Sequence, residues 1–151
     1  MATNKNLEIE NAQFIFKTNF SGEQSQFNPA GKRNFCVVID PELVNDLIAD
    51  GWNVRHTKPR DPEEEPTAYM QVSVSYDHIP PKIVLVSGKS QTVMTEETVG
   101  SLDWAEIENV DMVIRPYNWE AQGRTGVKGY VKLMYVTIAE DPFASKYHDE
   151  D

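Results

Sequence analysis

The fold is decided by two neighbouring segments, Val110-Asp-Met-Val-Ile-Arg-Pro-Tyr-Asn-Trp119 and Val127-Lys-Gly-Tyr-Val-Lys-Leu-Met-Tyr-Val-Thr-Ile138. Both are rich in β-branched and aromatic residues, which favour strands, and both show the period-2 alternation of a strand. The segment between them, Glu120 to Gly126, is polar and contains two glycines. The pattern predicts two strands joined by a flexible polar loop.

Alternation gathers cations and aromatic rings on one face of each expected strand. In the second strand that face carries Lys128, Tyr130 and Lys132, and the opposite face carries Val131, Leu133 and Tyr135. In the first strand one face carries Val113, Arg115, Tyr117 and Trp119, and Arg124 lies in the loop. Such a surface suits stacking on unpaired bases while cations hold the phosphates. The alternative is an ordinary solvated sheet face whose lysines discourage aggregation.

Length and composition indicate a single folded domain. The chain has 151 residues, of which 40% are hydrophobic, enough for a core. It contains no apolar run long enough for a transmembrane helix, and its polar first residues do not predict a secretory signal. A single cysteine, Cys36, cannot form an internal disulfide, and its apolar neighbours predict a buried thiol. We therefore expect a cytoplasmic protein.

The charge is unevenly distributed along the chain. A net charge of −10 opposes simple nucleic-acid binding, because phosphate contacts dominate that affinity. From residue 112 to 139, however, four basic residues face one acidic residue, and a second basic group comprises Lys32, Arg33, Arg55, Lys58 and Arg60. The acids gather at 63–65, 96–111 and the C-terminal end. This segregation is compatible with a basic groove on an acidic body.

The remaining segments predict more strands and little helix. Asp40-Pro41-Glu42 is a helix-start signal, and Leu43, Val44, Leu47 and Ile48 form its apolar face before Gly51 ends the helix. A short helix is expected after Thr95, with Trp104 in the core. Strands or extended segments are expected at 7–20 (with a bulge), 32–39, 52–56, 68–76, 82–86 and 92–94, and the charged stretch 58–66 reads as a loop.

Six or so strands that do not alternate with helices predict a mainly β fold rather than a parallel α/β sheet. We expect a small OB-like β-barrel with one or two short helices, and a β-sandwich as the second choice. The domain should span residues 1–142, followed by an acidic C-terminal tail at 143–151.

Enzymatic motifs are not found in the sequence. Three histidines and one cysteine do not give a zinc-ligand spacing, and neither a phosphate-binding Gly-rich loop nor a nucleophile elbow is present. The sequence therefore predicts a protein that is not an enzyme and needs no metal or cofactor.

An acidic chain end combined with a basic aromatic barrel resembles the phage-type single-stranded DNA-binding proteins. The segments Gly31–Ile39, Asp50–Asn53, Ile114–Trp119 and Gly126–Phe143 are also similar to those of small proteins from phages and integrated elements. The resemblance covers the chain from about Phe14 to Tyr147. It implies an OB-fold that acts in DNA replication or recombination, with an acidic tail that recruits replication or recombination partners.

The sequence thus predicts sequence-nonspecific binding of single-stranded DNA in phage or mobile-element replication or recombination. The expected binding residues are Lys32, Arg33, Arg55, Lys58, Arg60, Arg115, Tyr117, Trp119, Arg124, Lys128, Tyr130 and Lys132. Asp149, Glu150 and Asp151 are expected to contact partner proteins, and a homodimer stays open. Two alternatives remain: a protein-interaction module, such as a phage inhibitor or nucleic-acid mimic acting through its acidic surface, and a virion or tail component.

Overall fold

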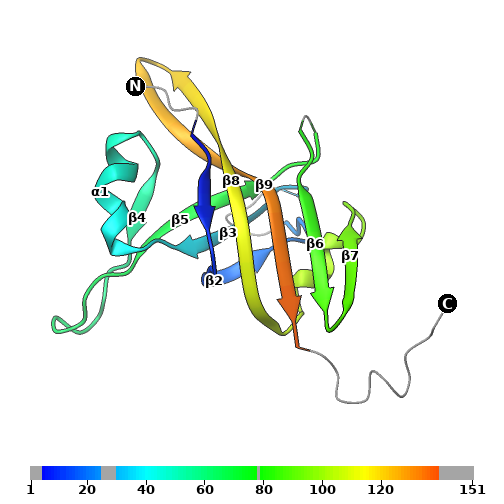
Figure 1. The fold of residues 1–151 in the computed structure, drawn as a ribbon. Coiled ribbons are helices and arrows are strands. Elements are labelled where there is room, and N and C mark those ends of the chain that lie inside the picture. The colour runs from blue at the N-terminus through cyan, green and yellow to red at the C-terminus, as the bar shows by residue number, and fades with distance from the viewer. Residues whose placement is uncertain (1–4, 25–29, 78, 140–151) are drawn as a thin grey trace.

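Over the residues that the structure describes, the fold is a single open β-sheet with one α-helix and one 3-10 helix. A computed structural model describes residues 5–24, 30–77 and 79–139, and within these ranges it contains nine strands (Figure 1). The predicted class, mainly β and OB-like, is confirmed. The predicted tail at 143–151, with Asp149, Glu150 and Asp151, lies outside the described residues. No helix in the described ranges is long and apolar enough to cross a membrane.

The elements follow one another as β1 (Leu7–Ile9), β2 (Phe14–Asn19), β3 (Arg33–Val38), α1 (Pro41–Ala49), β4 (Val54–His56), β5 (Ala68–Val74), β6 (Lys82–Ser87), β7 (Ser90–Met94), the 3-10 helix η1 (Val99–Asp103), β8 (Ile107–Ala121) and β9 (Arg124–Ile138). The main path of the sheet is β1-β8-β9-β5-β3-β2. Strand β4 extends it beside β5, and the β6–β7 hairpin extends it beside β9.

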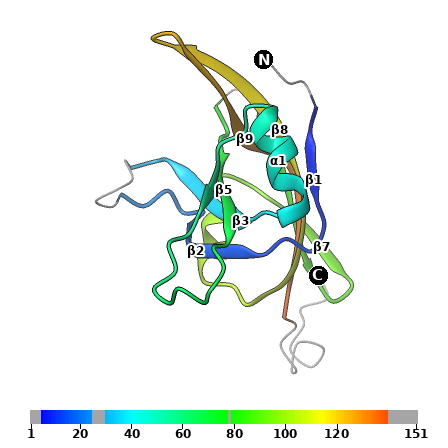
Figure 2. The ribbon, with the colours of Figure 1, turned by 90° about the vertical axis from the view of Figure 1, so that its left-hand side faces the viewer.

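Strand β9 connects the two halves of the sheet. Its first half pairs in parallel with β5, with Ser73 opposite Tyr130, and its second half pairs in parallel with β6. Along its whole length β9 also pairs antiparallel with β8. The β8–β9 hairpin is therefore both the central element of the sheet and, at its tip, an arm that extends past it (Figures 1 and 2).

The core lies on the concave inner face of the sheet. Alternate residues of β3 and β5 are buried there, among them Phe35, Val37, Met70, Val72 and Val74, and they meet Ile114, Val131 and Met134 of the hairpin. Along β5 the buried residues Met70, Val72 and Val74 alternate with residues that face outward, as the period of a strand requires. Trp52 is also buried and packs near Gly129, whose missing side chain leaves room for its ring.

Helix α1 begins as the sequence predicts. The Asp40 carboxylate accepts a hydrogen bond from the Glu42 N–H, and Pro41 occupies the first turn. The predicted apolar face is half right, since Val44 and Leu47 are buried but Leu43 and Ile48 are exposed. The helix lies beside β4 at one side of the sheet (Figure 1) and buries only a narrow stripe against it.

The predicted loop at 120–126 is wrong. The ladder between β8 and β9 continues to the pair Ala121–Arg124, leaving Gln122 and Gly123 as a two-residue turn. Both residues have positive φ, 53° and 77°, as a type I′ hairpin turn requires. The hairpin arm is therefore ordered strand to its tip.

Two further predictions need correction because the ladder is irregular. The expected strand at 7–20 is two strands, since Asn11 has a φ of 52° and the chain leaves β8 for β3 at this point. In β9 the register shifts beside Lys132, so that Met134 and Val136 are buried and Tyr135 is exposed, contrary to the expected inward Tyr135.

The segment after β7 also differs from the prediction at one residue. A short helix is present as η1, but Trp104 is 73% exposed rather than in the core. The neighbouring Asp103 turns inward instead. Its carboxylate accepts hydrogen bonds from the Thr18 hydroxyl and from the N–H groups of Phe20 and Ser21, which ties β2 to η1.

Candidate nucleic-acid interface

Two tyrosines and two cations meet on the outer face of the β8–β9 hairpin. Arg115 lies opposite Tyr130 in the ladder, and Tyr117 lies opposite Lys128. The tyrosine rings are edge to face, with centroids 5.9 Å apart. The Arg115 guanidinium lies 4.8 Å and the Lys128 ammonium 5.1 Å from the centre of the Tyr130 ring. These four residues, the hairpin cluster, combine π-faces for bases with charges for phosphates.

Trp119 continues the hairpin cluster toward the tip. It lies opposite Gly126, and a Cβ on Gly126 would come within 2.6 Å of the indole ring. The glycine thus lets the indole lie flat across the neighbouring strand. With Tyr117 51% and Trp119 39% exposed, both rings offer surface to a ligand.

The hairpin cluster borders a groove of about 680 Å³ that crosses β3, β5 and β9. Trp119, Lys128 and Tyr130 form one wall, and the polar residues Asn34, Gln71 and Ser73 lie along its course. The groove is also lined by Asn53, Gln71 and Ser73, which were not among the binding residues expected from the sequence. Period-2 alternation along β5 does, however, place Gln71 and Ser73 on its outward face.

Arg33 lies at the other end of the groove. Its guanidinium is 5.8 Å from the centre of the Tyr76 ring, and its Nη1 is 3.4 Å from the Glu96 Oε1. Burial raises the pKa of the Tyr76 hydroxyl, which Arg33 partly offsets, so this ring is neutral at physiological pH. Arg33 lines the groove, but the Glu96 carboxylate already offsets part of its positive charge.

Three buried polar atoms have no hydrogen-bond partner among the described residues: Arg33 Nε, Arg115 Nε and the Tyr76 hydroxyl. Buried polar groups are nearly always hydrogen-bonded in folded proteins. Arg33 and Tyr76 line the groove, and Arg115 belongs to the hairpin cluster that borders it. These atoms have essentially no exposed surface, so in this conformation they lie beside the groove without reaching into it.

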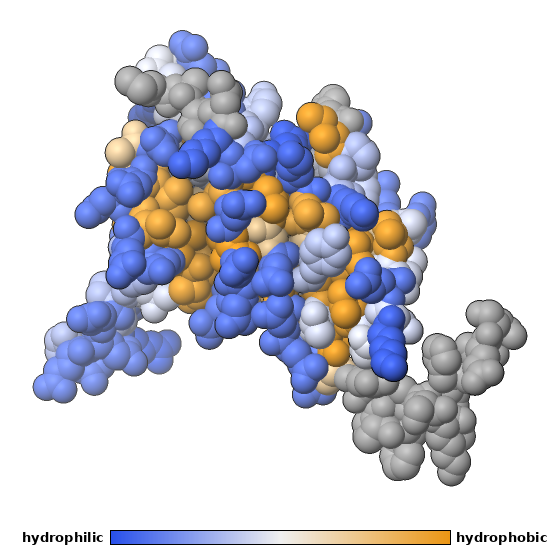
Figure 3. Space-filling model, in the orientation of Figure 1, coloured by the Kyte–Doolittle hydropathy of each residue, from blue (hydrophilic) through white to orange (hydrophobic). Residues whose placement is uncertain are grey.

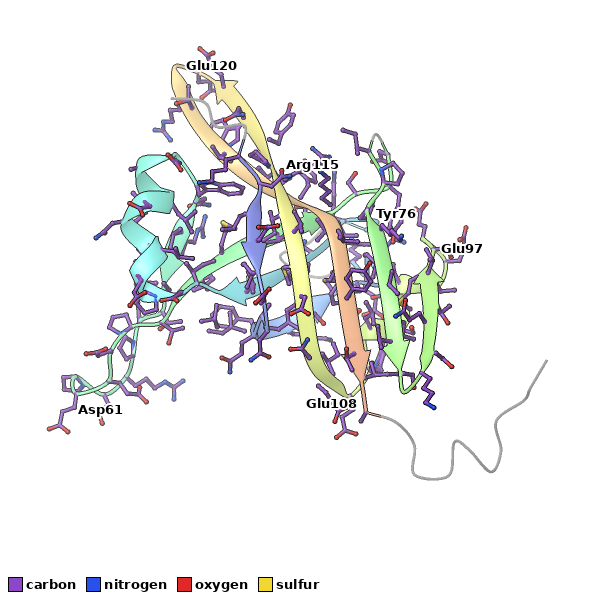
Figure 4. All side chains as sticks on the ribbon, viewed as in Figure 1. Asp61, Tyr76, Glu97, Glu108, Arg115 and Glu120 are labelled. Atoms are coloured by element: carbon purple, nitrogen blue, oxygen red, sulfur yellow. The ribbon has the colours of Figure 1, made fainter. Side chains whose placement is uncertain are left out.

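The other predicted cations are spread more widely. Lys32 is exposed and lines the groove, whereas Arg55 is exposed on β4, directly opposite Tyr69. Lys58 and Arg60 lie on the β4–β5 loop, whose far end carries Asp61 (Figure 4). Arg124 is exposed at the hairpin tip near Glu120, and Lys132 is exposed at the irregularity in β9. The fold thus brings together Lys32, Arg33, Trp119, Lys128 and Tyr130 around the groove, with Arg115 and Tyr117 beside it.

Hydrophilic and apolar residues are unevenly distributed over the face of the molecule that Figure 3 shows. In Figure 3 hydrophilic residues cover the β4–β5 loop and the hairpin arm, while apolar residues gather across the middle of the same view. Within the described residues, no group of three or more His, Cys, Asp or Glu side chains is arranged to hold a metal ion.

Comparison with solved structures gives the same fold. The single-stranded DNA-binding protein of bacteriophage Enc34 is similar both as a C-terminal truncation and in complex with ssDNA, each with a TM-score of 0.54 and 10% identity. The alignments cover 91% of this chain and 88% and 89% of those chains. A single-stranded DNA-binding protein encoded by bacteriophage T7 aligns over 99% of this chain and 97% of that chain at 11% identity, with a TM-score of 0.43 that is too low to show a common fold. No curated protein matches the chain.

The family model described as a putative phage ssDNA-binding domain matches residues 1–150. This match confirms the resemblance expected from the sequence. Because it spans nearly the whole chain, the protein belongs to the family of putative phage single-stranded-DNA-binding domains.

Proposed function

We propose that the protein binds single-stranded DNA without sequence preference along the groove and the hairpin cluster, in phage or mobile-element replication or recombination. Bases stack on Tyr117, Trp119 and Tyr130. The phosphates are held by Arg115, Lys128 and Lys32, with Arg33, Arg55, Lys58, Arg60, Arg124 and Lys132 as flanking charges. The protein acts as a binding module rather than an enzyme, in the cytoplasm of the host.

One observation carries this proposal: two tyrosines and two cations meet on the outer face of the hairpin, beside an open groove. Stacking on an aromatic ring accepts every base, because every base has a π-face, so it gives affinity without sequence readout. The groove wall supplies hydroxyl and amide groups at Ser73 and Gln71 that suit sugars and phosphates as well as bases. Family membership supports the same ligand.

The proposal extends to the parts of the chain that the structure does not describe. We propose that the binding domain comprises residues 1–142, and that the acidic residues Asp149, Glu150 and Asp151 recruit replication or recombination proteins. A homodimer formed through sheet edges is compatible with this arrangement.

Fluorescence anisotropy with a labelled oligonucleotide tests the proposal. An oligomer of roughly 30 nucleotides exceeds the ~4–16 nucleotides that one OB domain covers, so it can occupy the whole surface. We expect tighter binding to the single strand than to the duplex, weakening as salt rises because counterions are released. The double variant Tyr130→Ala, Lys128→Glu should lose most of this affinity.

The matched control is the double variant Tyr135→Ala, Lys89→Glu. It removes one exposed tyrosine and reverses one lysine at positions outside the groove. If both double variants bind single strands equally well, the hairpin cluster is not the binding surface. If the wild-type protein binds neither single strands nor duplex, the proposed function is wrong.

A further inference from the structure

Phe16 has a backbone conformation that bulky residues seldom adopt. Its φ is 64°, in the left-handed region where a Cβ clashes with the backbone. Two residues earlier, Phe14 points inward and packs edge-on against Phe35 at 5.0 Å and Phe20 at 5.9 Å. Regular alternation would send Phe16 into the same core. Instead its ring is 60% exposed.

The turned-out ring of Phe16 packs against Tyr69 on the outer face of the sheet. The two ring centroids are 5.1 Å apart at an interplanar angle of 84°. Arg55, on the neighbouring strand, lies directly opposite Tyr69 and is exposed. Two aromatic rings beside a cation repeat the composition of the hairpin cluster on a different part of the sheet.

This second aromatic pair adjoins the end of the groove. Tyr69 is the next outward residue along β5 after Gln71, which lines the groove. Cys36 lies opposite Gln71, between the groove and the pair. Burial raises the pKa of the Cys36 thiol, and the positive charge of Arg55 partly offsets this. The outer face is therefore continuous from Tyr130 to Phe16.

We propose that Phe16 and Tyr69 form a second base-stacking platform for single-stranded DNA, with Arg55 holding an adjoining phosphate. Tyr130 is paired with Ser73, four residues from Tyr69 on β5, so strand geometry separates the two platforms by about 14 Å. That distance corresponds to roughly four nucleotides at the ~3.4 Å spacing of a stacked strand. The inference rests on the proposed function and extends its surface beyond the groove.

The backbone of Phe16 provides a matched pair of variants. Phe16→Ala and Phe16→Gly both remove the ring, but only Ala keeps a Cβ in the left-handed conformation. For a long single strand we expect both to lose affinity equally, by about five- to 150-fold, the value of one stacked base. We also expect Phe16→Gly to melt at a higher temperature than Phe16→Ala. Trp104→Ala, which removes an even more exposed ring outside the groove, should bind as the wild type does.

The single thiol reports the path of the strand directly. A strand that spans both platforms must cross Cys36, so saturating oligonucleotide should slow its alkylation by a maleimide in the wild-type protein. In Phe16→Gly, the ratio of the rates with and without saturating DNA should return toward one. Because each variant is its own reference, a change in thiol exposure caused by the substitution does not enter the ratio.

The outcomes separate the two proposals. If the Phe16 variants bind like the wild type and DNA leaves Cys36 reactive, while Tyr130→Ala still weakens binding, the second platform is rejected and the hairpin cluster stands. If variants at Phe16 and at Tyr130 both leave the affinity unchanged, the hairpin cluster is rejected as the binding surface together with this inference, whereas a wild-type protein that binds no single strand would overturn the proposed function itself. Loss of affinity in both, with protection of Cys36 in the wild type, supports the continuous surface.

Discussion

The Trp119 ring can lie across β9 because Gly126 has no side chain. A Cβ there would approach the indole to 2.6 Å, closer than real contacts permit, and the half-exposed ring is free to swing away. We therefore predict that Gly126→Ala weakens binding of single-stranded DNA, by up to the ~1–3 kcal/mol of one stacked base. Its melting temperature should change little. Anisotropy titration and thermal melting of the same preparation check both expectations.

Gly129 offers the contrasting substitution on the opposite face of β9. An added Cβ would lie 2.9 Å from the Ile114 side chain, which is fully buried and cannot move aside. Overpacking of this kind costs about 1–3 kcal/mol of stability. Gly129→Ala should thus lower the melting temperature, whereas Gly126→Ala should not. Equal melting temperatures for the two variants would contradict this assignment of the two glycines.

Residue positions were predictable from the sequence wherever the backbone is regular. Alternation correctly grouped Arg115 with Tyr117 and Trp119 because β8 is uninterrupted between 114 and 121. Alternation does not hold at Phe16, where the left-handed backbone reverses the side-chain direction, and it failed at Tyr135, which follows a register shift. The expected burial of Trp104 was also wrong, because Asp103 rather than the indole fills the space beside β2. In each case a non-local contact overrides the local pattern.

The turn of the β8–β9 hairpin contains a residue, Gln122, that its turn type does not favour. Type I′ turns favour Asn-Gly, and here Gln122 occupies the first position with a φ of 53°. We predict that Gln122→Asn stabilises the protein, because Asn tolerates the left-handed region better than Gln. Gly123→Ala should destabilise it by about 1 kcal/mol, because its φ is 77°. Chemical denaturation of the two variants and the wild type checks the order of stabilities.

The elements that the sequence identified carry local chemical signals. The Asp-Pro-Glu start fixed α1, because capping depends on neighbouring residues alone. The hairpin turn was mistaken for a loop because a seven-residue stretch with four polar residues and two glycines indicates a loop more strongly than a glycine indicates a tight turn. The division of residues 7–20 into β1 and β2 depends on which strands they join, and partner choice is not a local property.

At the scale of the whole molecule, a net charge of −10 coexists with cations around a groove. The groove is partly neutralised from within, since Glu96 lies 3.4 Å from Arg33. We predict that Glu96→Gln raises the affinity for single-stranded DNA by up to about fivefold, because it releases a guanidinium for phosphate. The slope of log affinity against log salt should steepen by about 0.7, the share of one additional phosphate.

Glu97→Gln provides the control for this change in charge. It alters the net charge equally, but the Glu97 carboxylate does not form the ion pair that holds Arg33. We expect a smaller gain in affinity and an unchanged salt slope. If the two variants behave alike, the overall field of the protein, rather than the Arg33–Glu96 contact, sets the affinity.

The continuous pairing of β8 and β9 restricts how this protein can change in length. One residue inserted into β8 between Arg115 and Tyr117 would move the side chains from there to the tip to the opposite face and separate Tyr117 from Tyr130. Two residues inserted into each strand would keep every side chain on its original face and lengthen the hairpin by one pleat. We expect the hairpins of related phage proteins to differ in length by multiples of four residues, so that insertions and deletions there should occur in matched pairs during evolution.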